Sequence, residues 1–200
     1  MKDYREQTIF KVQDEHRSIS AVLSGLRELA RAAQDLTVRP DFRVLRAMIH
    51  YIDAYPEKLH HPNEELYLFK PLVVRAPYAS KLVEELRAQH GRGESLIREL
   101  ERAVIAFEVD WPEGAPQFAS AVNDYADFHW SHMRKEEQEL LPLCERYFTA
   151  DDWRLAADAF GANDNVLAEI KDREFSKLFT RIVNLAPAPV GLGTPWTKAG

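Results

Sequence analysis

Two similar stretches of the sequence decide the expected fold and the kind of site that it carries. The first is HHPNEELYLFKP, residues 60–71, and the second is HMRKEEQELLP, residues 132–142. In each stretch a glutamate follows a histidine after four residues, so both side chains lie on one face of a helix about one turn apart. Each stretch then reaches apolar residues and a proline. The two stretches therefore indicate a repeated helical unit with a His-x-x-x-Glu motif.

The repeat extends to the helices that precede the two motifs. Each of these helices carries one histidine in its apolar stripe, with His16 lying 44 residues before His60 and His90 lying 42 residues before His132. Two helix pairs with equivalent polar side chains can fold about a pseudo-twofold axis. Such folding brings six candidate metal ligands to one point: His16, His60, Glu64, His90, His132 and Glu136.

The rest of the chain has the pattern of an all-helical protein. It contains only 8 glycines, and its apolar residues recur at intervals of three and four. Prolines interrupt this pattern at positions 40, 77 and 112. We therefore expect an all-α, up-down-up-down four-helix bundle over residues 1–148. The expected helices cover residues 4–33, 41–70, 78–108 and 116–148.

Two further segments follow the predicted bundle. Residues 149–185 are expected to form an additional C-terminal helical extension that packs on the bundle, with Asp151 or Asp152 as the N-cap of its first helix. Residues 186–200 are rich in proline and glycine, and they are expected to form a flexible tail.

Size, charge and composition limit the functions that this chain can have. It has 200 residues, of which 46% are hydrophobic, and this is enough for a continuous buried core. Its 26 basic residues are scattered among 32 acidic ones, which argues against nucleic-acid binding. Because the sequence shows neither an apolar run of about 18 residues nor a signal peptide, we expect a cytoplasmic protein without membrane association. Cys144 is the only cysteine, so any metal would be held by histidine and carboxylate.

The second helix offers two registers for its motif, His60 with Glu64 or His61 with Glu65. The stripe of apolar residues earlier in this helix continues to His60 and leaves His61 on the opposite side. We therefore prefer His60 and Glu64. A kink at Pro62 can still turn His61 inward, so His61 is kept as a reserve ligand.

Four other residues lie near the candidate ligands in the sequence. Glu94 lies one turn after His90 and is a candidate for a seventh ligand. His129 lies one turn before the fourth-helix motif, which favours a hydrogen-bonding role. His50 lies about 15 Å along the helix from the second-helix motif, so we expect it at the surface or at a bundle end. Cys144 has no partner cysteine and is expected to pack in the core.

The proposed ligands favour a pair of transition-metal ions. Four imidazoles and two carboxylates suit iron, with manganese or zinc as possible substitutes, and they do not suit calcium. Two carboxylates argue for two ions, because each can bridge the pair and offset part of its charge in a bundle core. With a bridging oxide or hydroxide, one or two coordination positions remain for a small diatomic ligand.

A metal-free core is the alternative interpretation of these residues. A single histidine on an apolar stripe is more often a hydrogen-bonded core residue than a ligand. Four such histidines on four successive helices, two of them paired with a glutamate, would leave several buried polar groups without a partner if no metal were bound. The combination therefore favours the metal site.

The motifs resemble those of the hemerythrin-like proteins, the group with a His-His-Glu cation-binding domain. The resemblance covers residues 10 to about 148. It is carried by Asp14-Glu15-His16-Arg17, by His60-His61-Pro62-Asn63-Glu64-Glu65 before Leu68-Phe69, by Glu85-Leu86-Arg87-Ala88-Gln89-His90, and by His132-Met133-Arg134-Lys135-Glu136-Glu137-Gln138 before Leu141-Pro142.

The resemblance implies a non-haem di-iron centre that is bridged by oxygen and two carboxylates. Members bind dioxygen reversibly, sense oxygen or redox state, bind nitric oxide, or are linked to the repair of iron–sulfur centres. Oxygen-carrying members have His-x-x-x-His on the third helix, whereas this chain has Glu94 at the second position. The repair proteins also have a cysteine-containing N-terminal extension, which we do not expect in this protein. These departures argue against a stable oxygen carrier and against the repair role.

The expected function is therefore binding or sensing of O₂ or NO at a di-iron centre. The alternative is iron storage or delivery, or a redox role under peroxide or nitrosative stress, and the sequence leaves open whether the protein is an enzyme. Ferritin-like enzymes need two Glu-x-x-His motifs, and this chain has one, Glu57-Lys58-Leu59-His60. A sensor module and a purely structural bundle are further alternatives. A homodimer or an unknown protein partner is also left open.

Overall fold

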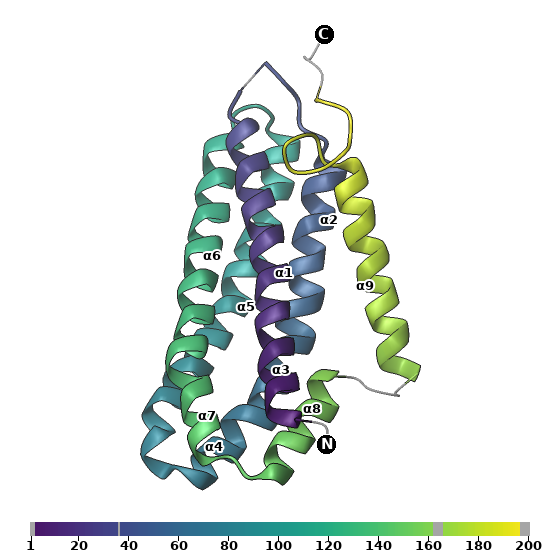
Figure 1. The fold of residues 1–200 in the computed structure, drawn as a ribbon. Helices are drawn as coiled ribbons and strands as arrows, with labels where there is room; N and C mark the ends of the chain where they lie inside the picture. Colours follow the sequence, from purple (N-terminus) through teal and green to yellow (C-terminus); the bar gives the residue numbers. More distant parts are fainter. Residues whose placement is uncertain (1–2, 36, 162–165, 197–200) are drawn as a thin grey trace.

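The computed structural model describes residues 3–35, 37–161 and 166–196, and its main feature is a bundle of four antiparallel helical rods (Figure 1). The first rod is α1 (Tyr4–Ala32). The third rod is α5 (Ser80–Val109), which follows a 3₁₀ turn, η3 (Pro77–Ala79). The predicted all-α, up-down-up-down bundle is confirmed.

The second and fourth rods combine α-helical segments with wider, π-helical ones. The second rod comprises α2 (Phe42–Ile52), η1 (Asp53–His60), α3 (His61–Glu64), η2 (Glu65–Phe69) and α4 (Lys70–Arg75). The fourth comprises α6 (Ala115–Lys135), η4 (Glu136–Leu140) and α7 (Leu141–Tyr147). The second rod continues past residue 70, where we expected its end, because the wide turn η2 directly before Pro71 lets the backbone stay helical around the proline.

The four rods form a closed square in cross-section. α1 packs against α2 and α6, and α5 packs against the same two helices from the other side. α8 (Ala150–Gly161) packs on α1, and α9 (Val166–Leu185) lies along α2 (Figure 1). The domain boundaries suggested by the sequence at residues 148 and 185 stay a prediction.

The segment after the bundle differs from expectation in two details. Thr149, rather than Asp151 or Asp152, caps α8. Its hydroxyl accepts a hydrogen bond from the Asp152 N–H at 3.3 Å, and the Asp152 carboxylate accepts one from the Thr149 N–H at 2.8 Å. Residues 186–196 contact α9, where we expected a flexible tail: the Leu192 N–H donates to the Val183 carbonyl at 2.7 Å. Residues 197–200 lie outside the described residues.

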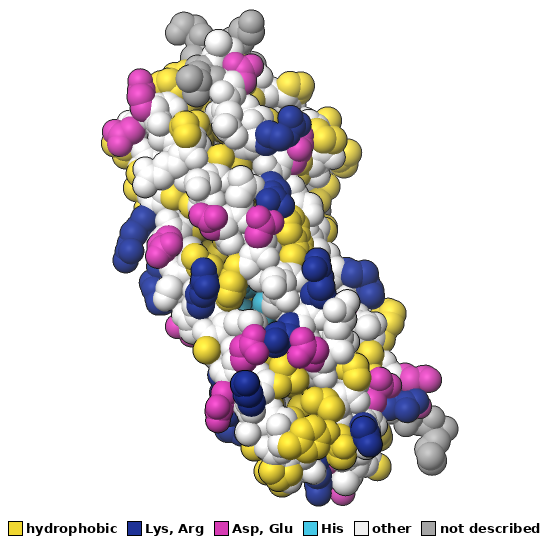
Figure 2. Space-filling model, turned by 90° about the vertical axis from the view of Figure 1, so that its left-hand side faces the viewer, with side chains coloured by type: hydrophobic (Ala, Val, Ile, Leu, Met, Phe, Trp, Pro, Cys, Tyr) yellow, Lys and Arg dark blue, Asp and Glu magenta, His cyan; other side chains and the backbone are white. Residues whose placement is uncertain are grey.

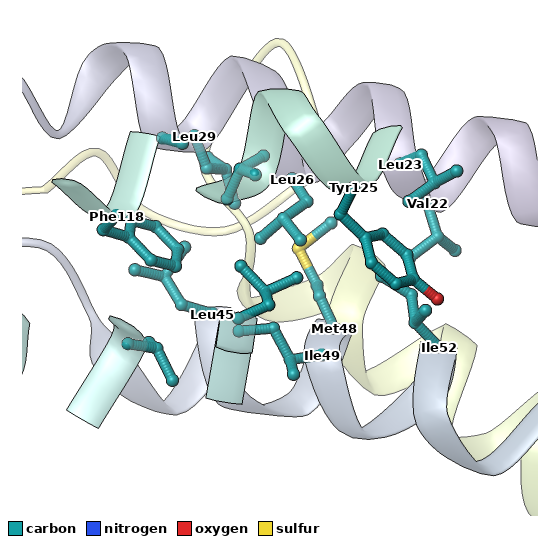
Figure 3. Packing of buried hydrophobic residues seen from close by; sticks show 14 of the residues in the cluster. Val22, Leu23, Leu26, Leu29, Leu45, Met48, Ile49, Ile52, Phe118 and Tyr125 are labelled. Carbon is teal, nitrogen blue, oxygen red and sulfur yellow. The ribbon is translucent and has the colours of Figure 1, made fainter. Parts of the chain in front are cut away.

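Two apolar cores fill the bundle. The large core lies between α1, α2, α5 and α6 and includes Leu26, Leu45, Met48 and Phe118 (Figure 3). The small core lies at the other end, where Val12, Leu68, Leu86 and Leu140 meet α8. Each rod thus carries two apolar stretches, and the residues between these stretches form a separate layer across the bundle.

Among the described residues, no helix combines the length and apolar character that a membrane crossing needs. Acidic and basic side chains are interspersed over the face shown in Figure 2.

Candidate metal centre

The layer between the two cores is polar and buried. It contains the six side chains expected at the centre together with His61, and each of them is at most 8% exposed. Burying so many ionisable groups is costly unless they hold a cation or pair with one another. Figure 2 shows one histidine at the bottom of a hollow on that face. Of the histidines in the layer, His90 is the most exposed, at 8%.

Wide helical turns shape both rods that carry a motif, and each of these turns is followed by a proline. Before each proline, the backbone N–H bonds a carbonyl five residues back instead of four: His61 to Pro56, Lys70 to Glu65, and Leu141 to Glu136. A proline has no N–H for the carbonyl four residues earlier, and its ring pushes that carbonyl away. The prolines at 62, 71 and 142 therefore explain where the helices widen.

Because of the wide turn η1, His61 points in a different direction from the one predicted. One additional residue in a turn rotates everything after it by about 100°. The inward face therefore moves from the stripe that we followed through α2 to a face that includes both His60 and His61. His60 is 2% exposed and His61 is 6% exposed, so the prediction that His61 faces the opposite side was wrong. The structure brings both histidines into the same layer.

Among the described residues, the side chains that could hold metal ions form two overlapping groups. The first position is surrounded by His16, His60, Glu64 and Glu136. The second position is surrounded by His61, Glu64, His90 and His132. Within each group the candidate ligand atoms all lie within 4.8 Å of one another.

Glu64 faces both groups of histidines. Its Oε1 lies 3.2 Å from His60 Nε2 and 3.8 Å from His16 Nε2. Its Oε2 lies 3.5 Å from His90 Nε2. One carboxylate therefore presents one oxygen to each position, which is the arrangement of a bridging ligand.

Glu136 has the same arrangement on the opposite rod. Its Oε2 lies 3.5 Å from His16 Nε2. Its Oε1 lies 3.2 Å from His132 Nε2 and 3.7 Å from His90 Nε2. The two His-x-x-x-Glu motifs thus contribute equivalent carboxylates, as the internal repeat predicts.

Polar partners on the outer ring nitrogens orient three of the histidines. Each Nδ1 lies within hydrogen-bond distance of a side-chain oxygen: His16 at 2.8 Å from Glu137, His60 at 2.6 Å from Glu15, and His132 at 2.8 Å from Gln89. When Nδ1 carries the proton, the Nε2 lone pair is left facing the layer, as metal ligation requires.

The inner atoms of the site lack hydrogen-bond partners among the described residues. These buried atoms are both carboxylate oxygens of Glu64 and of Glu136, both ring nitrogens of His90, and Nε2 of His132. Buried polar atoms without partners are rare in folded proteins. Converging carboxylate oxygens and imidazole nitrogens form the donor set that iron, zinc and manganese accept, so the residues fit a metal pair.

Both inner carboxylates are strong acids in this setting. Burial acts to raise the pKa of Glu64, but His60 and His16 outweigh it and hold that pKa well below its usual range. Burial and Glu64 act to raise the pKa of Glu136, but His132 and His90 lower it to about 2. The two carboxylates are therefore ionised at neutral pH and available as ligands.

The histidines differ in how tightly they hold a proton. Burial acts to lower the pKa of His90, but Glu136 and Glu64 raise it to about 10. Burial lowers the pKa of His61 to about 4, so this imidazole is neutral at pH 7. Because a ligand must present its lone pair, a cation that binds at the second position displaces a proton from His90.

Glu94 does not reach the centre. Its side chain is 61% exposed and lies 3.8 Å from the guanidinium of Arg98. Its position one turn after His90 is thus on the solvent side of α5, and the buried neighbour on the site side is Gly93. The structure contradicts the expectation of a seventh ligand there.

The remaining predicted positions agree with the structure. His50 is exposed, and Cys144 is buried in the small core. His129 is 1% exposed, and its Nε2 lies 3.2 Å from the hydroxyl of Tyr125, so its hydrogen-bonding role is confirmed.

Sequence reasoning missed the outer partners of the ligands. Glu15, Gln89 and Glu137 each directly precede or follow a candidate ligand, but such neighbours are usually solvent-exposed on a helix. Glu57 carries a clearer signal, because it lies four residues before His61 and thus on the same helical face.

A surface groove leads to the first position. It lies between α1 and α6, has a volume of about 600 Å³, and is lined in part by His16, Trp130 and Glu137. A small molecule in this groove is separated from the centre by the His16 ring and the Glu137 carboxylate that bonds it.

Comparison with known proteins agrees with this geometry. The chain matches the family model described as the hemerythrin HHE cation binding domain over residues 8–144, a range that contains every residue of both groups. A comparison with curated proteins gives no match. Because the match spans more than half of the chain, this protein belongs to the hemerythrin family and carries its HHE cation-binding domain.

Proposed function

We propose that this protein binds two iron ions side by side and that the pair binds a diatomic molecule, O₂ or NO. The observation that carries the proposal is the position of Glu64 and Glu136. Each directs one oxygen to the histidines of the first position and the other oxygen to those of the second. Two carboxylates in this arrangement can each bridge a metal pair, whereas a single ion would leave one oxygen of each carboxylate without a cation.

The two positions differ in their number of protein donors. The first position has the imidazoles of His16 and His60, and the second has those of His61, His90 and His132. Glu64 belongs to both groups, and Glu136 of the first group also directs Oε1 to His132 and His90 of the second, so both carboxylates count at each position. The first position therefore has one donor fewer, and we assign the exchangeable coordination site to it.

The surroundings of the first position suit a small ligand. The groove between α1 and α6 brings a small molecule from solvent as far as His16, so that the ring of His16 and the Glu137 carboxylate stand between it and the first position. The ring of Phe160 lies edge-on to the ring of His60, with centroids 6.0 Å apart, and excludes water on that side. When bound, a ferrous pair supplies electrons and an open coordination position to the diatomic molecule.

Anaerobic reconstitution with ferrous iron tests this proposal. We expect two iron ions per chain and, on exposure to O₂ or NO, a new charge-transfer absorption band that disappears when the gas is removed. Immediate irreversible oxidation would instead support the redox or iron-storage alternative. One iron ion or none per chain would contradict the proposal. His50→Ala is the matched control, because this histidine is exposed and lies outside both groups.

A further inference from the structure

A second buried polar group lies beside the centre, and the proposed ligands do not include it. It consists of Glu57, Tyr125 and His129, which are at most 8% exposed. The Tyr125 hydroxyl donates a hydrogen bond to Glu57 Oε1 at 2.9 Å, and His129 Nε2 lies 3.3 Å from the same oxygen. These contacts fix one oxygen of the Glu57 carboxylate and thereby set the direction of the other.

The second oxygen of Glu57 faces a candidate metal ligand. Its Oε2 lies 3.3 Å from Nδ1 of His61, one helical turn later in the same rod. This oxygen has no hydrogen bond within the part of the chain that the structure describes. A carboxylate on the outer side of an imidazole attracts the ring proton to the nearer nitrogen and leaves the farther nitrogen with its lone pair.

A glycine on α5 provides the space for this carboxylate. A Cβ at Gly93 would lie 3.1 Å from Glu57 Oε1 and 3.4 Å from its Oε2. It would also lie 3.4 Å from Cε1 of His129. A side chain at position 93 would therefore press on the carboxylate and on the residue that holds it. Since Glu94 faces solvent, α5 contributes only His90 to the centre and leaves this space to the second rod.

We propose that Glu57 is a positioning residue that directs the imidazole of His61 to the second metal position, and that Tyr125, His129 and Gly93 hold Glu57 in place. The inference rests on the proposed two-metal centre. It explains how the second position obtains a third imidazole although α5 carries only one. Glu57 acts through His61 and does not itself reach the metal.

Glu57→Gln is the first test, because the amide keeps the shape of the carboxylate but has one oxygen. That oxygen can face Tyr125 or His61 but not both, so the amide N–H₂ must face the other of these two groups. We expect nitrogen-15 NMR of the metal-free chain to show the His61 proton on Nδ1 in the wild type and a mixture of tautomers in Glu57→Gln. The same tautomer in both proteins would overturn the inference, whatever the metal content.

Stepwise titration with Co²⁺ is the second test. We expect Glu57→Gln to weaken binding of one of the two ions by about 10- to 100-fold, as is usual when an outer partner of a ligand is lost. The double variant Glu57→Gln/His61→Ala should bind no more weakly than His61→Ala, because Glu57 acts through that ring. Additive losses would show a separate structural role and overturn the inference.

Two further variants make the test specific. Gly93→Ala should weaken binding of the same Co²⁺ ion as Glu57→Gln does. Glu84→Gln is the matched control and should leave Co²⁺ binding unchanged, because Glu84 is exposed on α5. If Gly93→Ala leaves Co²⁺ binding unchanged, the part of the inference in which Gly93 holds Glu57 in place is overturned. If the wild type binds fewer than two Co²⁺ ions, the metal pair fails, and the tautomer measurement still decides the role of Glu57.

Discussion

The rings of His61 and His90 are stacked, with centroids 4.1 Å apart and planes inclined by 13°, although the two residues come from different rods. Phe69 stacks on the other face of His90, with a centroid distance of 5.2 Å and an inclination of 15°. The ring of His90 is thus held between a phenyl group and a second imidazole. This stack fixes the direction of two imidazoles at the second position.

Removing the His61 side chain should therefore weaken metal binding. We expect His61→Ala to lower the affinity for one of two iron ions by at least about tenfold, because a ligand and one layer of the stack are lost together. His132→Ala should lower bound iron further, and His50→Ala should retain all of it. Iron content after gel filtration measures all three variants. Equal iron content in His132→Ala and His50→Ala would contradict the assigned ligands.

Glu64 and Glu94 should differ sharply although both are glutamates near candidate ligands. Glu64→Gln removes a charge and one of the two oxygens that face the two positions, so we expect loss of both metal ions. Glu94→Gln alters an exposed side chain, so the metal content should stay at that of the wild type. Elemental analysis of both variants checks the prediction. Metal loss in Glu94→Gln would contradict it and would show that Glu94 is a ligand.

The metal-free protein should lose stability as pH rises above neutrality. The pKa of His90 is raised from 6.5 to about 10, so its stabilising contribution is complete below about pH 6.5 and is lost towards pH 10. The pKa of Glu136 is lowered from 4.5 to about 2, so its contribution is complete above about pH 4.5 and is lost at lower pH. Stability from these groups is therefore greatest between pH 4.5 and 6.5.

Urea unfolding from pH 5 to pH 9.5, with and without Fe²⁺ under anaerobic conditions, measures this effect. The added stability from Fe²⁺ should grow with pH over the same interval, because protons and metal compete for the ligands. A metal-free protein that becomes more stable between pH 7 and pH 9 would contradict the assigned protonation.

The large core should determine stability without affecting metal content. Leu26 is fully buried there, and Leu26→Ala should lower the free energy of unfolding by about 2–5 kcal/mol through lost contacts and a cavity. Leu66→Ala is the matched control and should lower the free energy of unfolding much less, because Leu66 is 46% exposed. Urea unfolding at pH 6 measures both. A loss of bound iron in folded Leu26→Ala would show that the large core and the centre are coupled.

The bundle could be predicted because the apolar residues recur in the sequence at the intervals of a helix. Apolar residues at helical intervals and prolines between the stripes determine four rods, and the repeat of His16 with His60 and of His90 with His132 places these residues at equivalent heights. Position along a rod follows from counting residues at 1.5 Å each. The six principal side chains could therefore be named without any structure.

Orientation around a rod was less predictable, and only the tertiary structure decided it. His61 turns inward because the wide turn before Pro62 changes the register, and a count that assumes 3.6 residues per turn cannot detect an additional residue. Gly93, and not Glu94, faces the site for a related reason, because which face of α5 is buried depends on where α6 and the second rod pack. The sequence by itself determined which chemistry the chain carries. Packing between rods determined which of two adjacent side chains takes part, because burial is a property of neighbours that lie far apart in the chain.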